Sequence, residues 1–265
     1  MDLGLEGRSV FITGGSGGLG GPMARVFAAE GANVALTYHR NKSAASEVAE
    51  AVEKDGGQAL ALPYDLGDEQ SIRSAVDAVT AEWGGIDVLV VNASPARGPD
   101  EHRGPFETVP VETWRAQLRE EVEGAFHTVQ AVVPGMKARG WGRIVLMSAS
   151  IVNRGMRGEE AYVASKAALH GLNRTLATEL VGHGILSNAV APGPTVTANL
   201  LPKVPPEIRA TLAGLSPAEI QQVLNERIPQ LRFGLPEDVA RVVAFLGSDA
   251  NRHVTGSVVN VAGGH

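Results

Sequence analysis

The sequence predicts an α/β fold in which a doubly wound parallel sheet of about seven strands is covered by helices on both faces. Apolar runs of strand length alternate with amphipathic helical patterns four times before residue 94. The fourth run, 86–93, is apolar almost throughout, as a sheet covered on both faces requires. A glycine-rich turn follows the first run. We therefore expect a ligand at the carboxyl ends of the strands.

Length and composition narrow the class of protein. A chain of 265 residues with 44% apolar content suits one domain spanning 1–265. The net charge of -6 argues against a nucleic-acid or anionic membrane surface, so we expect a small-molecule partner. The chain has no cysteine, and its seven histidines lack metal-ligand spacing, so no metal site is expected. Without a signal sequence or a membrane-length apolar run, the expected location is the cytoplasm.

The glycine-rich turn at 13–21 is the first sign of a nucleotide site. It follows a strand predicted at 9–12 and precedes a helical pattern at 19–30, in whose first turn Pro22 is tolerated. Glycines let the backbone approach a pyrophosphate closely, and the unpaired amides of a helix start attract it. A flexible glycine loop is the alternative.

The second predicted strand, 31–38, ends in basic residues. An acidic residue there would hydrogen-bond the ribose hydroxyls of NAD, whereas His39 and Arg40 suit the 2′-phosphate of NADP. NADP is therefore the predicted cofactor, with NAD less favoured. The alternative is a solvated basic loop beside an NAD site.

The remaining pattern continues the alternation and then departs from it. The segment at about 198–230 is polar and punctuated by proline, carries a helical pattern near 217–225, and is the expected substrate lid. The long helical pattern at 111–139 has an apolar stripe that indicates core or a subunit interface. The other expected elements are helices at 43–54, 72–83, 162–180 and 236–246, strands at 59–66, 141–147, 185–190 and 257–261, and a loop at 94–110.

Tyr162 and Lys166 begin the helical pattern at 162–180. At a spacing of four residues they lie on one helix face, so the ammonium can sit beside the phenol and favour its ionised form. This arrangement makes a proton donor or acceptor usable near neutral pH. Taken alone, the pair also fits an ordinary helix surface.

Six motifs recur in order along the chain: Thr13-Gly-Gly-Ser-Gly-Gly18-Leu-Gly20, Asp65, Asn92-Ala93, Tyr162-x-x-x-Lys166, Pro192-Gly193 and Gly234-x-Pro-Glu-Asp-Val-Ala. Together they resemble the short-chain dehydrogenase/reductase family, of the 3-ketoacyl-carrier-protein reductase type, over nearly the whole chain. The resemblance implies a Rossmann-fold oxidoreductase in which Tyr162 passes a proton to or from a carbonyl or alcohol substrate while hydride moves at the nicotinamide. It also implies a homodimer or homotetramer assembled through 111–139 and 160–181.

The resemblance also implies roles for matched residues. Lys166 would support the tyrosine and hold the nicotinamide ribose, Asp65 would face the adenine, and Asn92 would adjoin the adenosine ribose. The expected cofactor-binding residues are Gly14, Ser16, Gly18, Leu19, Gly20, His39, Arg40, Asp65, Leu66, Asn92, Ala93, Tyr162, Lys166, Pro192, Gly193, Thr195 and Thr197.

One departure from the family pattern concerns the substrate-orienting serine. The family places it 13 residues before the tyrosine, where this chain has Ala149. Strand alternation would point Ser148 and Ser150 away from the direction of Ala149, unless a bulge or a slip of one residue re-aims one of them. Ser150 precedes a glycine-containing turn and is the expected catalytic serine. Ser148, or no serine at all, are the alternatives.

A second departure lies in the long helix. Glu121 stands where the family carries an asparagine, and it could pair with Lys166, shuttle protons or be solvated. Ser94 replaces the glycine of the Asn-Ala-Gly turn, which is a milder change.

The leading prediction is an NADP(H)-dependent carbonyl reductase, or the reverse alcohol dehydrogenase, with Tyr162 as the general acid/base. The departures at Ala149 and Glu121 keep an alternative open: a non-redox cyclase, dehydratase or isomerase, or a cofactor-bound binding subunit. The lid leucines and Arg154 suit a medium-sized, partly apolar substrate with an anionic group, but its identity is not indicated.

Overall fold

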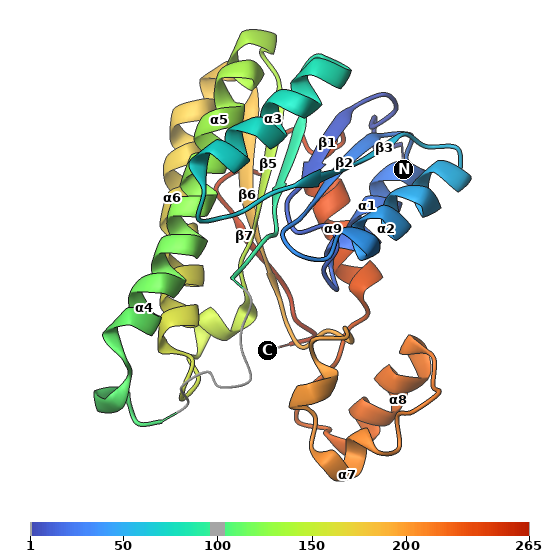
Figure 1. Cartoon of the computed structure of the whole chain (residues 1–265), viewed down its shortest axis with the longest axis vertical. Helices are drawn as coiled ribbons and strands as arrows, with labels where there is room; N and C mark the ends of the chain where they lie inside the picture. Colours follow the sequence, from blue (N-terminus) through green and yellow to red (C-terminus); the bar gives the residue numbers. More distant parts are fainter. Residues whose placement is uncertain (1, 96–103, 265) are drawn as a thin grey trace.

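Seven parallel strands form one sheet in the computed structural model, which describes residues 2–95 and 104–264 (Figure 1). The sheet order is β3-β2-β1-β4-β5-β6-β7. The strands are β1 (Ser9–Ile12), β2 (Asn33–Tyr38), β3 (Ala59–Pro63), β4 (Val88–Val91), β5 (Gly142–Met147), β6 (Ile185–Pro192) and β7 (Val258–Val261). The predicted doubly wound sheet is confirmed. Its strand order reverses between β1 and β4, which is where this topology opens a crevice at the carboxyl ends.

Helices cover both faces of the sheet, and each face has its own apolar cluster. On one face Phe27 and Val243 pack against the strands, and on the other Ile72, Met136 and Leu169 do so. Every residue of β1, β4 and β5 is buried between these clusters, which explains their continuous apolar runs. The helices are α1 (Gly20–Ala29), α2 (Lys42–Lys54), α3 (Glu69–Trp83), α4 (Val111–Leu118), α5 (Gly124–Arg139), α6 (Glu160–Leu180), α7 (Pro206–Arg209), α8 (Pro217–Arg227) and α9 (Pro236–Leu246).

The long helix predicted at 111–139 is interrupted in the middle. Between α4 and α5 lies one π-helical turn, η2 (Arg119–Glu123). α5 ends at Arg139 and is followed by Gly140, which is in the left-handed region with φ +67°. A π-helical turn holds one residue more than an α-helical turn and is often found at functional sites. The side chains that face the protein interior therefore follow one helical register before η2 and another after it.

The segment at 198–230 folds beyond the carboxyl edge of the sheet (Figure 1). It contains a short 3-10 turn, η5 (Leu201–Lys203), followed by α7 and α8, and Leu212, Leu224 and Phe233 pack in a cluster separate from the two sheet clusters. At its base the N–H of Gly234 donates to the carbonyl of Pro194 at 2.9 Å. The helix predicted near 217–225 is confirmed as α8. The role of the segment as a substrate lid, within one domain, stays a prediction.

Several element ends differ from expectation. The third strand ends at 63 rather than 66, and β6 runs on to Pro192. The loop predicted at 94–110 includes 96–103, which lie outside the described residues, and it ends in a 3-10 turn, η1 (Phe106–Thr108). Across 2–95 and 104–264, no helix combines the length and apolar character needed to cross a bilayer.

Candidate active site

The glycine-rich turn lies at the carboxyl end of β1 and is braced by the strands on either side. Gly14 has φ +68°, and its N–H donates to the hydroxyl of Thr37 on β2 at 2.9 Å. From the end of β4, the Asn92 side-chain nitrogen donates to the carbonyls of Thr13 and Gly14, both at 3.0 Å. A Cβ on Gly14 would lie 2.9 Å from the Cα of Ala93, so the turn requires glycine there. Asn92, expected beside the adenosine ribose, thus uses its amide to hold the turn.

The same turn has the features that a pyrophosphate requires. Among the described residues no side chain caps α1 at Leu19, so the first amides of that helix point at the turn without a side-chain acceptor. Ser16 and Gly18 lie within the turn, and a Cβ on Gly18 would come to 2.7 Å from the Cβ of Thr197. The turn therefore approaches Thr197, the residue directly before the segment at 198–230. Its residues fit a dinucleotide.

The ends of β2 and β3 bring the expected adenosine-binding residues together. The His39 Nε2 lies 3.3 Å from a carboxylate oxygen of Asp65, and both side chains are about half exposed. Arg40, next along the chain, is exposed. Leu66 packs against the backbone of Gly124, where a Cβ would lie 2.6 Å from the leucine side chain. Asp65 thus engages His39, whereas Arg40 and, at the start of α2, Lys42 are exposed cations at this edge.

Tyr162 and Lys166 lie one turn apart at the start of α6. The Lys166 Nζ is 5.9 Å from the centroid of the Tyr162 ring, and only 4% of Lys166 is exposed. The ammonium donates to the carbonyl of Met147, the last residue of β5, at 2.8 Å. It also donates to the carboxylate of Glu121 at 2.6 Å. Since an ammonium has three donors, one remains for another acceptor.

Glu121 lies in η2 and is 3% exposed, so the solvated position considered for it is wrong. Its second carboxylate oxygen accepts the hydroxyl of Ser94 at 2.5 Å and lies 3.5 Å from the side-chain nitrogen of Gln117. That Gln117 nitrogen also donates to the Ser165 hydroxyl at 3.2 Å, which ties α4 to α6. Of the roles left open, the structure shows pairing with Lys166.

Burial and charge act on Lys166 in opposite directions. Burial by itself lowers the pKa of Lys166, because a desolvated ammonium is disfavoured. The charges of Glu121 and Tyr162, together with the hydrogen bond that Lys166 donates to Glu121, outweigh burial, so the pKa of Lys166 is raised. Lys166 is therefore a cation throughout the neutral range.

The two serines that flank Ala149 have different surroundings. The Ser148 hydroxyl faces α6, 2.7 Å from the His170 Nε2 and 3.3 Å from the carbonyl of Lys166. Ala149 is extended, and Ser150 begins a 3-10 turn, η3 (Ser150–Asn153). Ser150 is buried, and its hydroxyl makes no hydrogen bond to the described residues. Strand alternation ends with β5 at Met147, so η3 rather than the strand sets the direction of Ser150.

Sequence reasoning missed two polar residues at the site, Gln117 and His170. Gln117 precedes Glu121 by four residues, and His170 follows Lys166 by four. Helical spacing from the residues already singled out could have found both. Burial, followed by the charge of Arg174, lowers the pKa of His170, so its ring is neutral near pH 7.

The end of β6 supplies the residues expected along the nicotinamide. The N–H of Gly193 donates to the carbonyl of Val261 on β7 at 2.9 Å, directly after Pro192 ends the strand. The Thr195 hydroxyl donates back to the carbonyl of Gly193 at 3.0 Å. The carboxyl edge of the sheet thus carries the predicted residues from β1 through β6.

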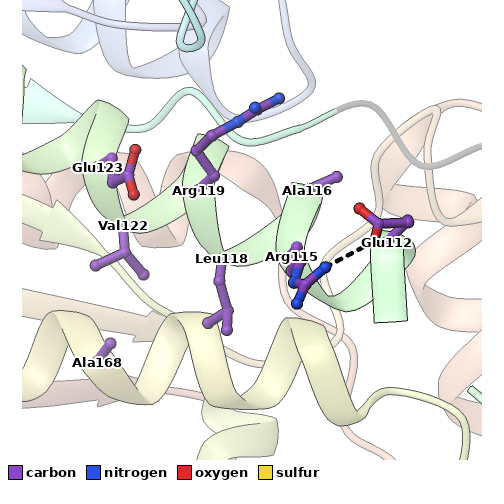
Figure 2. Close-up of a pocket in the computed structure, with 8 residues that line it drawn as sticks. All are labelled: Glu112, Arg115, Ala116, Leu118, Arg119, Val122, Glu123 and Ala168. Carbon is purple, nitrogen blue, oxygen red and sulfur yellow. Dashed lines mark hydrogen bonds and ion pairs between the residues drawn. The ribbon is translucent and has the colours of Figure 1, made fainter. Parts of the chain in front are cut away.

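A separate hollow of about 630 Å³ lies on the outer face of α4 and η2 (Figure 2). Leu118 and Val122 point toward Ala168 on α6, and an ion pair of 2.8 Å joins Glu112 to Arg115 at its rim. None of the predicted cofactor-binding or catalytic residues lines it. One turn beyond Val122, Phe126 is 47% exposed.

The chain is similar to several known reductases along its whole length. A family model described as enoyl-(acyl carrier protein) reductase matches residues 14–265. The 3-oxoacyl-(acyl-carrier-protein) reductase FabG of Thermotoga maritima is 36% identical over 262 residues, 98% of each chain.

Solved structures show the same likeness. The L-sorbose reductase of Gluconobacter frateurii, complexed with NADPH and L-sorbose, has a TM-score of 0.86 and 28% identity over 99% of this chain and 98% of that one. A 7α-hydroxysteroid dehydrogenase, complexed with NADH and 7-oxo glycochenodeoxycholic acid, has a TM-score of 0.85 and 30% identity over 99% of this chain and 96% of that one.

Proposed function

Because the chain belongs to the short-chain dehydrogenase/reductase family and is an NAD(P)-dependent oxidoreductase, we propose that it uses NADP(H) to reduce a carbonyl, or to oxidise the corresponding alcohol. Tyr162 is the general acid/base. The observation that carries this proposal is the position of Tyr162 beside the buried ammonium of Lys166, at the carboxyl edge of the sheet.

In the proposed mechanism each residue has one task. The bound nicotinamide supplies the hydride. Tyr162 donates its phenolic proton to the substrate oxygen as the carbonyl carbon is reduced. The cation of Lys166 favours the phenolate that this step leaves, and its remaining donor is available to a ribose hydroxyl. The glycine-rich turn holds the pyrophosphate.

The alternative of a cyclase, dehydratase or isomerase would use Tyr162 and Glu121 as acid and base on the substrate. Both oxygens of the Glu121 carboxylate are engaged within the protein, one by Lys166 and the other by Ser94. A carboxylate held in this way is not placed to take a proton from a substrate. We therefore propose the redox reaction rather than a non-redox one; a binding subunit without turnover is distinguished by the test that follows.

The first prediction tests the reaction. Purified protein is expected to oxidise NADPH, followed at 340 nm, in the presence of at least one ketone from a broad carbonyl panel. Tyr162→Phe is expected to lower kcat by at least about 100-fold, because it removes the proton donor. Its affinity for NADPH, measured by fluorescence titration, is the control for an intact site. Tight NADPH binding by wild type without turnover of any carbonyl would contradict the proposal.

Preference for NADP rests on the basic residues at the end of β2. Of the two solved relatives described above, one is complexed with NADPH and the other with NADH, so the family alone leaves the choice open. Arg40 is exposed and its planar guanidinium suits a phosphate, while His39 is already beside Asp65. We propose that Arg40 binds the 2′-phosphate.

Arg40→Ala is therefore expected to reduce the ratio of kcat/KM for NADPH to kcat/KM for NADH by about 10- to 100-fold. The reason is that the variant loses one or two charge-assisted hydrogen bonds to the 2′-phosphate. Lys54→Ala, at the far end of α2, is the matched control and should leave the ratio unchanged. An unchanged ratio in Arg40→Ala would show that another residue selects the cofactor.

For the substrate-orienting hydroxyl we propose Ser150. The Ser148 hydroxyl is already engaged by α6, whereas the hydroxyl of buried Ser150 has no partner among the described residues. An unengaged hydroxyl after β5 can donate to the oxygen on which charge develops.

Ser150→Ala is expected to lower kcat by about 100-fold, the effect of removing a single oxyanion donor. Ala149→Ser is the complementary variant and should change the rate little, because the role is already filled. Steady-state kinetics of both variants and wild type with one reducible ketone measures these effects. A large gain in rate on Ala149→Ser, with no loss on Ser150→Ala, would show that the serine position is vacant.

We also propose that the chain forms a homodimer or homotetramer through the outer face of α4, η2 and α6. Leu118 and Val122 line the hollow there, and exposed Phe126 continues the apolar row. Such a patch indicates an interaction surface.

Sedimentation analysis is expected to find no monomer at micromolar concentration. Phe126→Glu should weaken assembly by about tenfold or more, because it places a charge in the apolar part of the contact. Phe106→Glu, which alters an exposed phenylalanine in η1 that does not line the hollow, is the control. A monomeric wild type would contradict the assignment.

A further inference from the structure

We propose that Glu121 is a positioning residue that keeps Lys166 charged and directed at Tyr162, with Ser94 and Gln117 fixing its carboxylate. This inference rests on the proposed function for its catalytic meaning. It concerns a residue at which the chain departs from its family pattern.

The two oxygens of the Glu121 carboxylate have different partners. One oxygen accepts the ammonium of Lys166 at 2.6 Å, and the other accepts the hydroxyl of Ser94 at 2.5 Å, with the Gln117 amide at 3.5 Å. Neither end can turn away without breaking a hydrogen bond. Together with the carbonyl of Met147, Glu121 occupies two of the three donors of Lys166 and so limits the direction of the third.

The π-helical turn is what places Glu121 there. Gln117 on α4 and Glu121 on η2 both point inward, while Glu123 of the same turn is exposed and lines the outer hollow (Figure 2). Gln117 also bonds Ser165, the residue before Lys166. The position of the carboxylate relative to α6 is thus set by two side-chain contacts with that helix.

Charge explains why a carboxylate matters more than an amide. A buried lysine without a counter-charge can have a pKa of about 5 to 6. This is about five units below the pKa of a lysine in water. Within 2–95 and 104–264, the titratable groups that act on Lys166 are Glu121 from η2 and Tyr162 from α6, while β5 presents the carbonyl of Met147. Glu121 is therefore the anion that holds the proton on Lys166. An amide would keep the shape and lose this effect.

The test compares Glu121→Gln with wild type in the full chain. Lys166 is one of five lysines, so NMR of labelled lysine side chains, with Lys166→Met for assignment, can follow its protonation directly in the cofactor-free protein. We expect wild-type Lys166 to stay protonated through the neutral range and the variant to lose its proton at a clearly lower pH than wild type, because burial is then no longer offset by the carboxylate. Glu123→Gln, which removes the same charge from the exposed side of the turn, should behave as wild type.

Kinetics supply the second readout. In Glu121→Gln, kcat is expected to fall by about tenfold or more as pH rises over the interval in which Lys166 loses its proton, because the tyrosine loses its cationic neighbour. The KM for NADPH should change far less. Glu121→Asp restores the charge and should recover part of kcat at high pH. Ser94→Ala, which leaves the ion pair in place, should leave Lys166 protonated.

The outcomes separate the inference from the proposed function. Identical titration of Lys166 in wild type and Glu121→Gln overturns the inference, whatever the activity. A shifted titration with no change in the pH profile of kcat also overturns it. If wild type reduces no carbonyl while the titration still shifts in the variant, the reductase assignment fails, and the role of Glu121 in holding the proton on Lys166 is supported.

Discussion

The buried ammonium of Lys166 joins three parts of the fold that are far apart in the sequence. Its partners are the carbonyl at the end of β5 and the carboxylate of Glu121 in η2, and it is carried by α6. A lone charge in such a place would cost several kcal/mol, so each partner has to be in position for the site to exist. The end of β5, the interruption of the long helix and the start of α6 therefore depend on one another.

The parallel sheet imposes the rest of the geometry. Because neighbouring parallel strands end at the same edge, residues that come after β1, β4 and β5 meet there without any sequence relation. Thr13 shows how closely they are joined: its hydroxyl accepts the backbone amides of both Asn92 and Ala93 at 2.9 Å. The glycine-rich turn is thus shaped by β2 and β4 as well as by its own glycines.

Features that depend on local periodicity could be predicted from the sequence, and features that depend on distant partners could not. The strands follow continuous apolar runs and the helices an apolar period of 3.6 residues, so their order and approximate ends were accessible. The π-helical turn at 119–123 was not, because one inserted residue rotates the next part of the helix by about 100° without changing composition. Leu118 and Val122 thus line an outer hollow, whereas Met136, an apolar residue of the same predicted helix at 111–139, lies in the core.

The same distinction between local spacing and distant partners applies to the residues of the candidate site. Tyr162 and Lys166 were predictable because both belong to one helix, whereas the buried state of Glu121 depends on contacts from Ser94 and Lys166, each distant in the chain. A buried ion pair is weak evidence for stability, since a well-packed apolar pair of similar volume often serves the fold as well. An apolar side chain at 166 would offer no donor beside Tyr162 and no cation to support a phenolate. The pair is therefore better explained by the proton chemistry of the tyrosine than by the stability of the fold.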